Sequence, residues 1–233
     1  MTAKNLMNYP IKLSLKSEAA PIILIVAAWI FAFYFYAHFP AQVVTHWGFD
    51  GQPNGYMGKA AGAFAIPALL AGMYALLLGL PWLDPKSDRY AEFSGIYHFF
   101  KTAIIFVLFA VYIASGFYNL GYAVNINVIV PLLVGLLMIV LGNFMGKIKR
   151  NWFVGVRTPW TLSSENVWNK TNRFGGFMLV LFGIVLIISP LLSKPLAITL
   201  FVSGILLITI GTLVYSFVIY KQEQNKPKVD KGL

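Results

Sequence analysis

Residues 143–176 read NFMGKIKRNWFVGVRTPWTLSSENVWNKTNRFGG and form the longest interruption between the hydrophobic runs of this chain. The stretch contains six of the 18 Lys and Arg residues, three of the six tryptophans and a single acid, Glu165. Because hydrogen-bonding side chains are concentrated here beside apolar segments, we interpret it as the cytoplasmic working face of a membrane protein. The other segments then serve to position it.

Composition places the remainder of the chain in a bilayer. Of 233 residues, 58% are hydrophobic and 11% are charged, whereas soluble domains carry roughly 25% charged residues. A helix needs about 20 apolar residues to cross a membrane. The predicted fold is therefore all-α, a polytopic membrane protein with a six-transmembrane-helix bundle, and its expected spans are residues 19–37, 60–83, 102–120, 128–146, 174–193 and 196–219.

The basic residues predict the orientation of this bundle. Sixteen of the 18 Lys and Arg residues fall in the termini and loops of one side, and only Lys59 and Lys194 fall on the other. Basic residues accumulate in cytoplasmic loops. Both termini and residues 143–176 are therefore expected in the cytoplasm.

Four regions follow from this arrangement. Residues 1–18 form a cytoplasmic amino-terminal segment. Residues 19–101 contain the first two transmembrane helices with their extracellular loop and the cytoplasmic loop that follows. Residues 102–220 form a four-helix part that carries the 143–176 stretch. Residues 221–233 are polar and lysine-rich, which is typical of a disordered basic tail.

The composition also argues against several functions. The chain has no cysteine, which removes thiolate nucleophiles and disulfides. Its net charge of +10 belongs largely to residues that flank apolar runs, so we expect contact with membrane lipids and no direct binding of nucleic acid. No Asp, Glu, Lys, Arg or His lies near the middle of a predicted span, which argues against a proton-driven transporter. No cofactor is expected.

Small residues recur at helical spacing in two of the predicted spans. Gly142 and Gly146 follow Gly135 in the fourth span, and Ala71, Ala75 and Gly79 line the second. Such strips allow helices to approach closely. We favour helix packing over a ligand groove for both strips.

The outer loop between the first two spans is rich in turn residues. Asp50-Gly51 and Asn54-Gly55 are turn dipeptides, so a compact turn is the favoured interpretation. His38, His46 and Asp50 are weak candidates for metal ligands. Three such residues in one loop are not enough to predict a metal site.

Within residues 143–176, Thr158-Pro159 predicts an extended backbone before a helix start. Ser163 is expected to cap that helix and Leu162 to pack on Val167. The helix would then present Glu165, Trp168 and Asn172 on one face, because their spacing matches the helical repeat.

Arg157 precedes this helix and is expected to fold back onto Glu165, since charges in a partly dry interface need partners. Two interpretations remain open. In the first, these residues and two asparagines, Asn143 and Asn151, tie the loop to the helix ends. In the second, they form a polar pocket surrounded by Trp152, Trp160 and Trp168.

The stretch lacks a recognisable catalytic set. Glu165 has no histidine or second carboxylate near it in sequence, and Ser163 and Ser164 have no adjacent base. No glycine-rich phosphate loop is present. We therefore do not expect an enzyme.

These residues resemble a known family, the bacterial SdpI-type immunity and signal-transduction membrane proteins. In the outer loop, which resembles the amino-terminal DUF1648-like region of that family, the matching residues are Pro40, His46, Trp47, Asp50, Gly51 and Lys59. In the cytoplasmic stretch they are Gly142, Asn143, Asn151, Gly155, Arg157, Thr158, Pro159, Trp160, Thr161, Ser164, Glu165, Trp168, Thr171, Asn172, Arg173 and Gly175.

The resemblance implies a protein of the bacterial cell membrane that protects its cell against a secreted toxic peptide. The outer loop would then meet the peptide, and the cytoplasmic face would capture a transcriptional repressor at the membrane. This chain departs from the family pattern at Asn172, where many relatives are expected to have histidine. That departure argues against a proton- or metal-dependent role at this position.

Two other functions remain as alternatives. One is a facilitator or transporter for a small molecule or lipid, whose path would lie between the spans. The other, less favoured, is an intramembrane metal-assisted enzyme that uses Glu165.

Overall fold

The computed structural model describes residues 9–225 and contains six helices that are long and apolar enough to cross a membrane. They are α1 (Leu15–His38), α2 (Lys59–Leu83), α3 (Ser94–Asn119), α4 (Ile126–Met145), α6 (Glu165–Ile188) and α7 (Lys194–Gln224). The predicted number of spans is confirmed. Residues 1–8 of the expected amino-terminal segment and residues 226–233 of the expected tail lie outside the described residues. The first part of the expected tail, residues 221–224, continues α7 instead.

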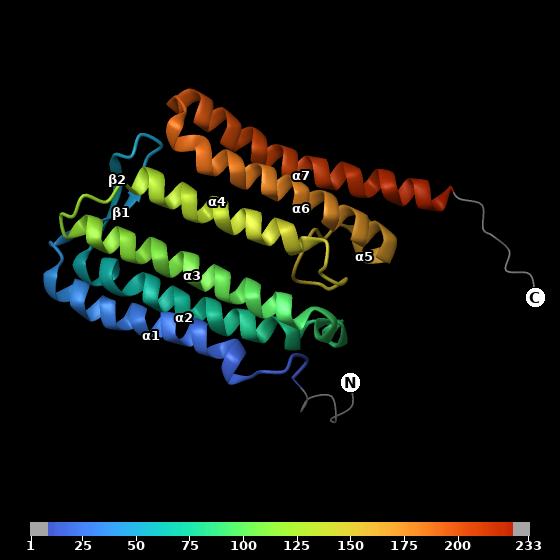
Figure 1. The fold of residues 1–233 in the computed structure, drawn as a ribbon, viewed down its shortest axis with the longest axis horizontal. Coiled ribbons are helices and arrows are strands. Elements are labelled where there is room, and N and C mark those ends of the chain that lie inside the picture. Colours follow the sequence, from blue (N-terminus) through green and yellow to red (C-terminus); the bar gives the residue numbers. More distant parts are fainter. Residues whose placement is uncertain (1–8, 226–233) are drawn as a thin grey trace, which may run out of the picture.

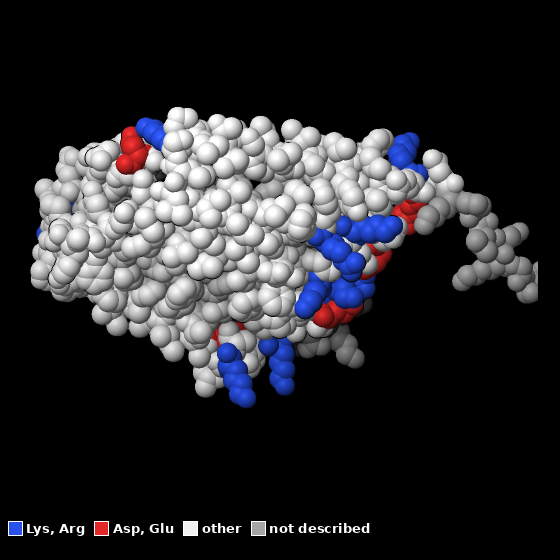
Figure 2. Space-filling view, turned by 45° about the horizontal axis from the view of Figure 1, so that its top comes forward, with Lys and Arg blue, Asp and Glu red and all other residues white. Residues whose placement is uncertain are grey.

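The helices form two groups of three (Figure 1). In the first half of the molecule, α1, α2 and α3 pack on one another, and in the second half α6 packs between α4 and α7. Contacts between α3 and α4 join the halves. Both ends of the described chain lie at one end of the bundle (Figure 1), where most visible Lys and Arg side chains also gather (Figure 2). We call this the basic end, and the opposite end the hairpin end.

Aromatic side chains fill the core of the first half. Phe35 of α1 is fully buried, its ring stacks on Phe39, and it meets the edge of Tyr112 of α3. Gly116 leaves the space that the Phe35 ring occupies, because a Cβ at that position would overlap the ring. The Tyr112 hydroxyl donates to the Ala63 carbonyl oxygen of α2 at 2.8 Å, so one side chain links α3 to α2.

A charged cluster is also buried in the first half, near the basic end. The Lys101 ammonium of α3 is 1% exposed and pairs with the Glu18 carboxylate of α1. The Tyr74 hydroxyl of α2 donates to the same carboxylate at 2.7 Å, and His98 Nδ1 lies 3.3 Å from it. The expected third span began at residue 102, whereas α3 begins at Ser94. The helix therefore includes His98 and Lys101, whose side chains turn inward toward the Glu18 carboxylate.

Glycines hold the second half together. A Cβ on Gly142 would lie 2.5 Å from the Gly176 carbonyl oxygen, and one on Gly135 would lie 2.6 Å from that of Gly183. The packing role predicted for the strip in α4 is confirmed. The prediction for α2 is wrong at Gly79, which has no atom within 4 Å of the Cβ position.

The outer loop contains a feature that the all-α prediction missed. Strands β1 (Gln42–Trp47) and β2 (Pro53–Gly58) pair in antiparallel fashion as a hairpin. The predicted turn at Asp50-Gly51 is confirmed, since Gly51 has a φ of +74°. The predicted turn at Asn54-Gly55 is wrong, because these residues lie within β2 and Gly55 pairs with His46.

Short elements connect the helices. They are η2 (Ser87–Phe93) after α2, α5 (Pro159–Ser163) before α6, and η3 (Ser189–Leu191) before α7. The cap prediction is corrected here. Thr158 caps α5 through its bond with the Thr161 amide, and Ser164, not Ser163, caps α6 by accepting from the Val167 amide.

Candidate functional site

The hairpin is fastened to both halves of the bundle. At its base, Asn119 of α3 accepts from the Val44 amide at 2.7 Å and donates to the Val44 carbonyl oxygen at 2.9 Å. At its tip, the Phe49 ring lies 5.6 Å from that of Phe201 in α7. The tip glycine, Gly51, approaches Asn127 of α4 so closely that a Cβ would lie 2.9 Å from the side-chain nitrogen. A shift between the halves must therefore deform or release the hairpin.

An ion pair closes the tip. Lys194 Nζ, at the start of α7, donates to Asp50 Oδ2 at 2.9 Å, and both side chains are about half exposed. The Lys194 ammonium and the Gln52 amide hold the pKa of the Asp50 carboxyl below its usual range. This contact is solvent-accessible, so it is weak and sensitive to salt.

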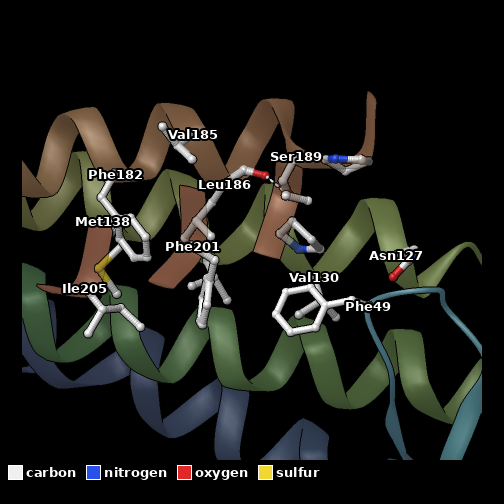
Figure 3. A pocket seen from close by; sticks show the side chains of 14 residues that line it. Phe49, Asn127, Val130, Met138, Phe182, Val185, Leu186, Ser189, Phe201 and Ile205 are labelled. Atoms are coloured by element: carbon white, nitrogen blue, oxygen red, sulfur yellow. Dashed lines mark hydrogen bonds between the residues drawn. The ribbon is translucent and has the colours of Figure 1, made fainter. Parts of the chain in front are cut away.

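A pocket of about 380 Å³ lies beneath the tip, between α4, α6 and α7. Figure 3 shows Phe49 entering it from the hairpin beside Val130 and Phe201. We call it the hairpin-end pocket, and its lining residues are Phe49, Asn127, Val130, Pro131, Val134, Met138, Phe182, Val185, Leu186, Ser189, Pro190, Ala197, Phe201 and Ile205. Its size and apolar lining are those of a ligand site.

The other predicted loop residues have separate contacts. His46 bonds to Asn54, and with Trp47 it lines a second apolar cavity of about 390 Å³ between β1, α2 and α3. Lys59 donates to the carbonyl oxygen at the end of α1, and His38 bonds to the Tyr34 carbonyl oxygen. His38, His46 and Asp50 do not converge, and within residues 9–225 no three His, Asp or Glu side chains are grouped to hold a metal ion.

At the basic end, Asn151 organises the loop before α5. Its side chain is fully buried, and Oδ1 accepts from the Phe153 and Val154 amides at 2.8 and 2.7 Å. Nδ2 donates to the Lys149 and Val154 carbonyl oxygens. An amide satisfied at both ends stabilises one loop conformation.

Trp168 and Asn172 of α6 bond the same loop from the other side. Trp168 Nε1 donates to the Ile148 carbonyl oxygen at 2.8 Å, and Asn172 Oδ1 accepts from the Val156 amide at 2.8 Å. Gly155 has a φ of +109°, and a Cβ there would lie 2.5 Å from Asn172 Oδ1, so only glycine fits. Asn151 therefore ties the loop together, as the first interpretation expected of it. Trp168 and Asn172, which that interpretation did not include, also bond the loop to α6.

The predicted Arg157–Glu165 pair is wrong. Arg157 donates to the Trp152 carbonyl oxygen at 2.8 Å. Glu165 instead accepts from Arg89 of η2 at 2.6 Å and lies 3.6 Å from Arg150. The extra short helix α5 separates the two predicted partners, and η2 brings a closer guanidinium from a distant part of the chain.

The three tryptophans do not surround one pocket. Trp168 is buried, Trp152 is 48% exposed, and Trp160 packs its ring 5.1 Å from Phe217 of α7. Pro159 starts α5, and Thr158 donates to Ser216 of α7 at 3.0 Å. The polar-pocket interpretation is therefore wrong, because these side chains serve different contacts.

Asn143 and Arg173 lie apart from Asn151. Both are exposed, and they line a separate groove between α4 and α6. Asn143 Nδ2 donates to the Ile139 carbonyl oxygen one turn earlier. The sequence analysis placed Asn143, Asn151 and Arg173 in one group. In the structure, Asn151 belongs to the folded loop, and Asn143 and Arg173 belong to this groove.

Sequence reasoning missed Asp84, a fully buried carboxylate at the end of α2. It accepts from the Trp152 amide at 2.9 Å, from the Tyr90 hydroxyl at 3.0 Å and from the Lys86 amide at 2.7 Å. Burial and the neighbouring Arg150 guanidinium lower the pKa of Lys86. One sequence feature could have pointed to Asp84: it is an acidic residue directly before Pro85, at the end of an apolar run.

A chain with six apolar helices whose large hydrophobic side chains are exposed along the bundle is a multi-pass membrane protein. Comparison with known proteins specifies its kind. Residues 147–220 match the SdpI/YfhL protein family, and residues 23–71 match a domain of unknown function, DUF1648. The resemblance to SdpI-type bacterial membrane proteins is therefore confirmed, and its two parts coincide with the hairpin region and with the region from the basic-end loop to α7.

One relative matches along nearly its whole length. Immunity protein SdpI of Bacillus subtilis (strain 168) is 25% identical over 208 residues, which are 89% of this chain and 98% of that protein. No solved structure matches the chain.

Proposed function

We propose that this chain is a membrane immunity protein that protects a bacterial cell against a secreted, membrane-active peptide. The observation that carries the proposal is the similarity to immunity protein SdpI over 89% of this chain. An immunity protein acts by binding, so the role is not enzymatic. In this proposal the basic end faces the cytoplasm, as expected for an excess of Lys and Arg, and the hairpin end faces outward.

The peptide binds at the hairpin end in this proposal. The hairpin-end pocket offers about 380 Å³ of apolar space, sufficient for one or two large side chains of a peptide that is itself apolar enough to attack a membrane. The exposed pair of Asp50 and Lys194 at its rim supplies weakly held polar groups. A peptide backbone can engage these groups without leaving a buried charge unpaired.

The chain has two functional parts in this proposal, residues 19–101 with the hairpin and residues 102–220 with the 143–176 stretch. The hairpin contacts α3 at its base and α4 and α7 at its tip. A peptide that lifts the tip therefore breaks the contacts by which the hairpin holds the two halves in position. The cytoplasmic end then reports binding, and a transcriptional repressor is captured there.

An exposed charged cluster supports the capture of a protein at that end. Arg89 pairs with Glu92 and Glu165, and Lys149 lies 3.7 Å from Glu92. These side chains are only partly buried, so a partner can exchange with each pair at little cost. A charge reversal, Glu92→Lys, tests this step. We expect it to abolish recruitment of the repressor to the membrane and to leave cell survival unchanged.

Survival of a sensitive cell tests immunity. A Bacillus subtilis strain that lacks SdpI would be challenged with the culture medium of its SdpI-containing parent, with and without this chain. We expect survival with the wild-type chain, loss with Ala197→Trp, which fills the pocket, and retention with Leu207→Trp, which faces outward on the same helix (Leu207 is 63% exposed). Equal membrane levels of the variants serve as the control. Killing of cells that contain the wild-type chain would contradict immunity to this peptide.

A facilitator is the competing function, and the apolar cavities between the helices are the observation that favours it. It predicts uptake of a small apolar solute into liposomes that contain the purified chain. Uptake blocked by Ala197→Trp, without protection of cells, would replace immunity with transport.

A further inference from the structure

We propose that the groove between α4 and α6 at the basic end binds the phosphate of an anionic phospholipid. The groove has a volume of about 370 Å³, and the side chains of Asn143, Lys147 and Arg173 line it. Nothing in the immunity function assigns it a role, and the inference does not depend on that function.

The groove exists because glycines remove side chains where α4 and α6 meet. A Cβ on Gly142 would collide with the Gly176 carbonyl oxygen, so the two backbones touch there. Gly146 lies farther from α6, and its Cβ position is 3.5 Å from the Arg173 Cα. The helices therefore diverge toward the basic end and leave a notch between Lys147 and Arg173.

The two cations at this notch have no acidic partner. Among residues 9–225, neither Lys147 nor Arg173 lies within salt-bridge distance of an Asp or Glu, a property that Lys170 and Lys221 share outside the groove. Both side chains are exposed. Two free positive groups beside the Asn143 amide match the chemistry of a phosphate, which needs charge neutralisation and hydrogen-bond donors.

The surroundings select a lipid over a free anion. Phe177 follows Arg173 by one helical turn, lines the same groove and is 57% exposed, and Val180 continues the apolar surface. The Lys147 ammonium lies 5.1 Å from the centre of the Phe144 ring. Cations at the end of a transmembrane pair, with apolar surface directly beyond them, fit a headgroup above its acyl chain.

Lipid binding to the purified full-length chain tests this assignment. Native mass spectrometry in detergent would measure binding of phosphatidylglycerol and of phosphatidylcholine to the wild type and to K147Q/R173Q. We expect a preference for phosphatidylglycerol, and a roughly tenfold to thirtyfold weaker binding of it in the double variant, because each basic residue near a lipid surface contributes about a factor of five. K170Q/K221Q removes the same charge outside the groove and is expected to stay within about twofold of the wild type.

Two outcomes would overturn the proposal. Equal losses in the two double variants would show a diffuse charge effect with no site at the groove. Displacement of phosphatidylglycerol by millimolar inorganic phosphate in the wild type would assign the groove to a free anion. Unchanged thermal unfolding of K147Q/R173Q excludes misfolding as the cause of a loss, and if it unfolds early, the milder R173K variant is expected to retain binding while R173Q loses it.

Discussion

The two halves of the molecule are held together by different means. In α1–α3, side chains fill the space between helices, with the Phe35 ring against Gly116 and the Lys101–Glu18 pair buried nearby. In α4, α6 and α7, the backbones of α4 and α6 touch through Gly142 and Gly176. Side-chain packing tolerates adjustment, whereas backbone contact does not. The packing of the first half therefore depends on side chains that complement one another. The packing of the second half depends on glycines, which leave no side chain between the helix backbones.

Lys101→Met should have the largest effect, because it leaves the Glu18 carboxylate buried without its cation. Removing one partner of a buried pair costs about 3–5 kcal/mol. The double variant E18Q/K101M restores balance and is expected to unfold later than K101M in thermal melts in detergent. Equal melting of the wild type and K101M would show that partner matching does not stabilise the first half.

Gly142→Ala should come next, since the Gly176 carbonyl oxygen lies 2.5 Å from the new Cβ and cannot rotate away. Overpacking of this kind costs about 1–3 kcal/mol. Gly79→Ala, which enters open space on α2, is the matched control, and the same thermal melts would measure both. If both substitutions lowered the melting temperature equally little, the backbone contact between α4 and α6 would not be what stabilises the second half.

Trp168→Phe should have a more local effect, confined to the basic-end loop. It leaves the buried Ile148 carbonyl oxygen without its donor, a loss of about 1–3 kcal/mol. Hydrogen exchange of the amides at residues 148–156 should accelerate, while Trp152→Phe, at a half-exposed position, leaves them unchanged. Unaltered exchange in Trp168→Phe would contradict the role of α6 in ordering the loop.

The contact between the halves at the hairpin tip should be the weakest, and it should depend on pH. Lys194 lowers the pKa of Asp50, so the pair is intact above the ordinary aspartate pKa of about 4 and is lost as pH falls through the lowered value. Nitroxide labels on cysteines introduced at Gln52 and Ile198 would report the separation without background, because the chain has no cysteine. We expect broader distances at low pH, and broad distances at every pH in Asp50→Asn.

The sequence was sufficient for the spans, because long apolar runs determine them locally. It was also sufficient for the turn at Gly51 and for the packing role of the glycine strip in α4, although not for its partners Gly176 and Gly183 in α6. Each of these patterns lies within one short segment of the chain, so residue spacing carries the information.

The remainder depended on distant partners. The donor to Glu165 is Arg89, 76 positions away, and Asn119 fastens β1 from 75 positions away. The partner of Lys101 is Glu18, separated by 83 positions. A local sequence pattern does not reveal which distant residue a side chain contacts. For this reason the sequence analysis paired Arg157 with Glu165 and placed the start of the third span at residue 102, later than the start of α3.

Site-specific photocrosslinking in living cells tests most directly whether the hairpin-end pocket receives the peptide. A photoreactive phenylalanine analogue would replace Phe201 inside the pocket or, as the control, Leu207 on the outward surface of α7. Our account predicts a crosslink to the secreted peptide from position 201 and none from position 207. Protected cells that show no crosslink from position 201, or an equal crosslink from both positions, would contradict it.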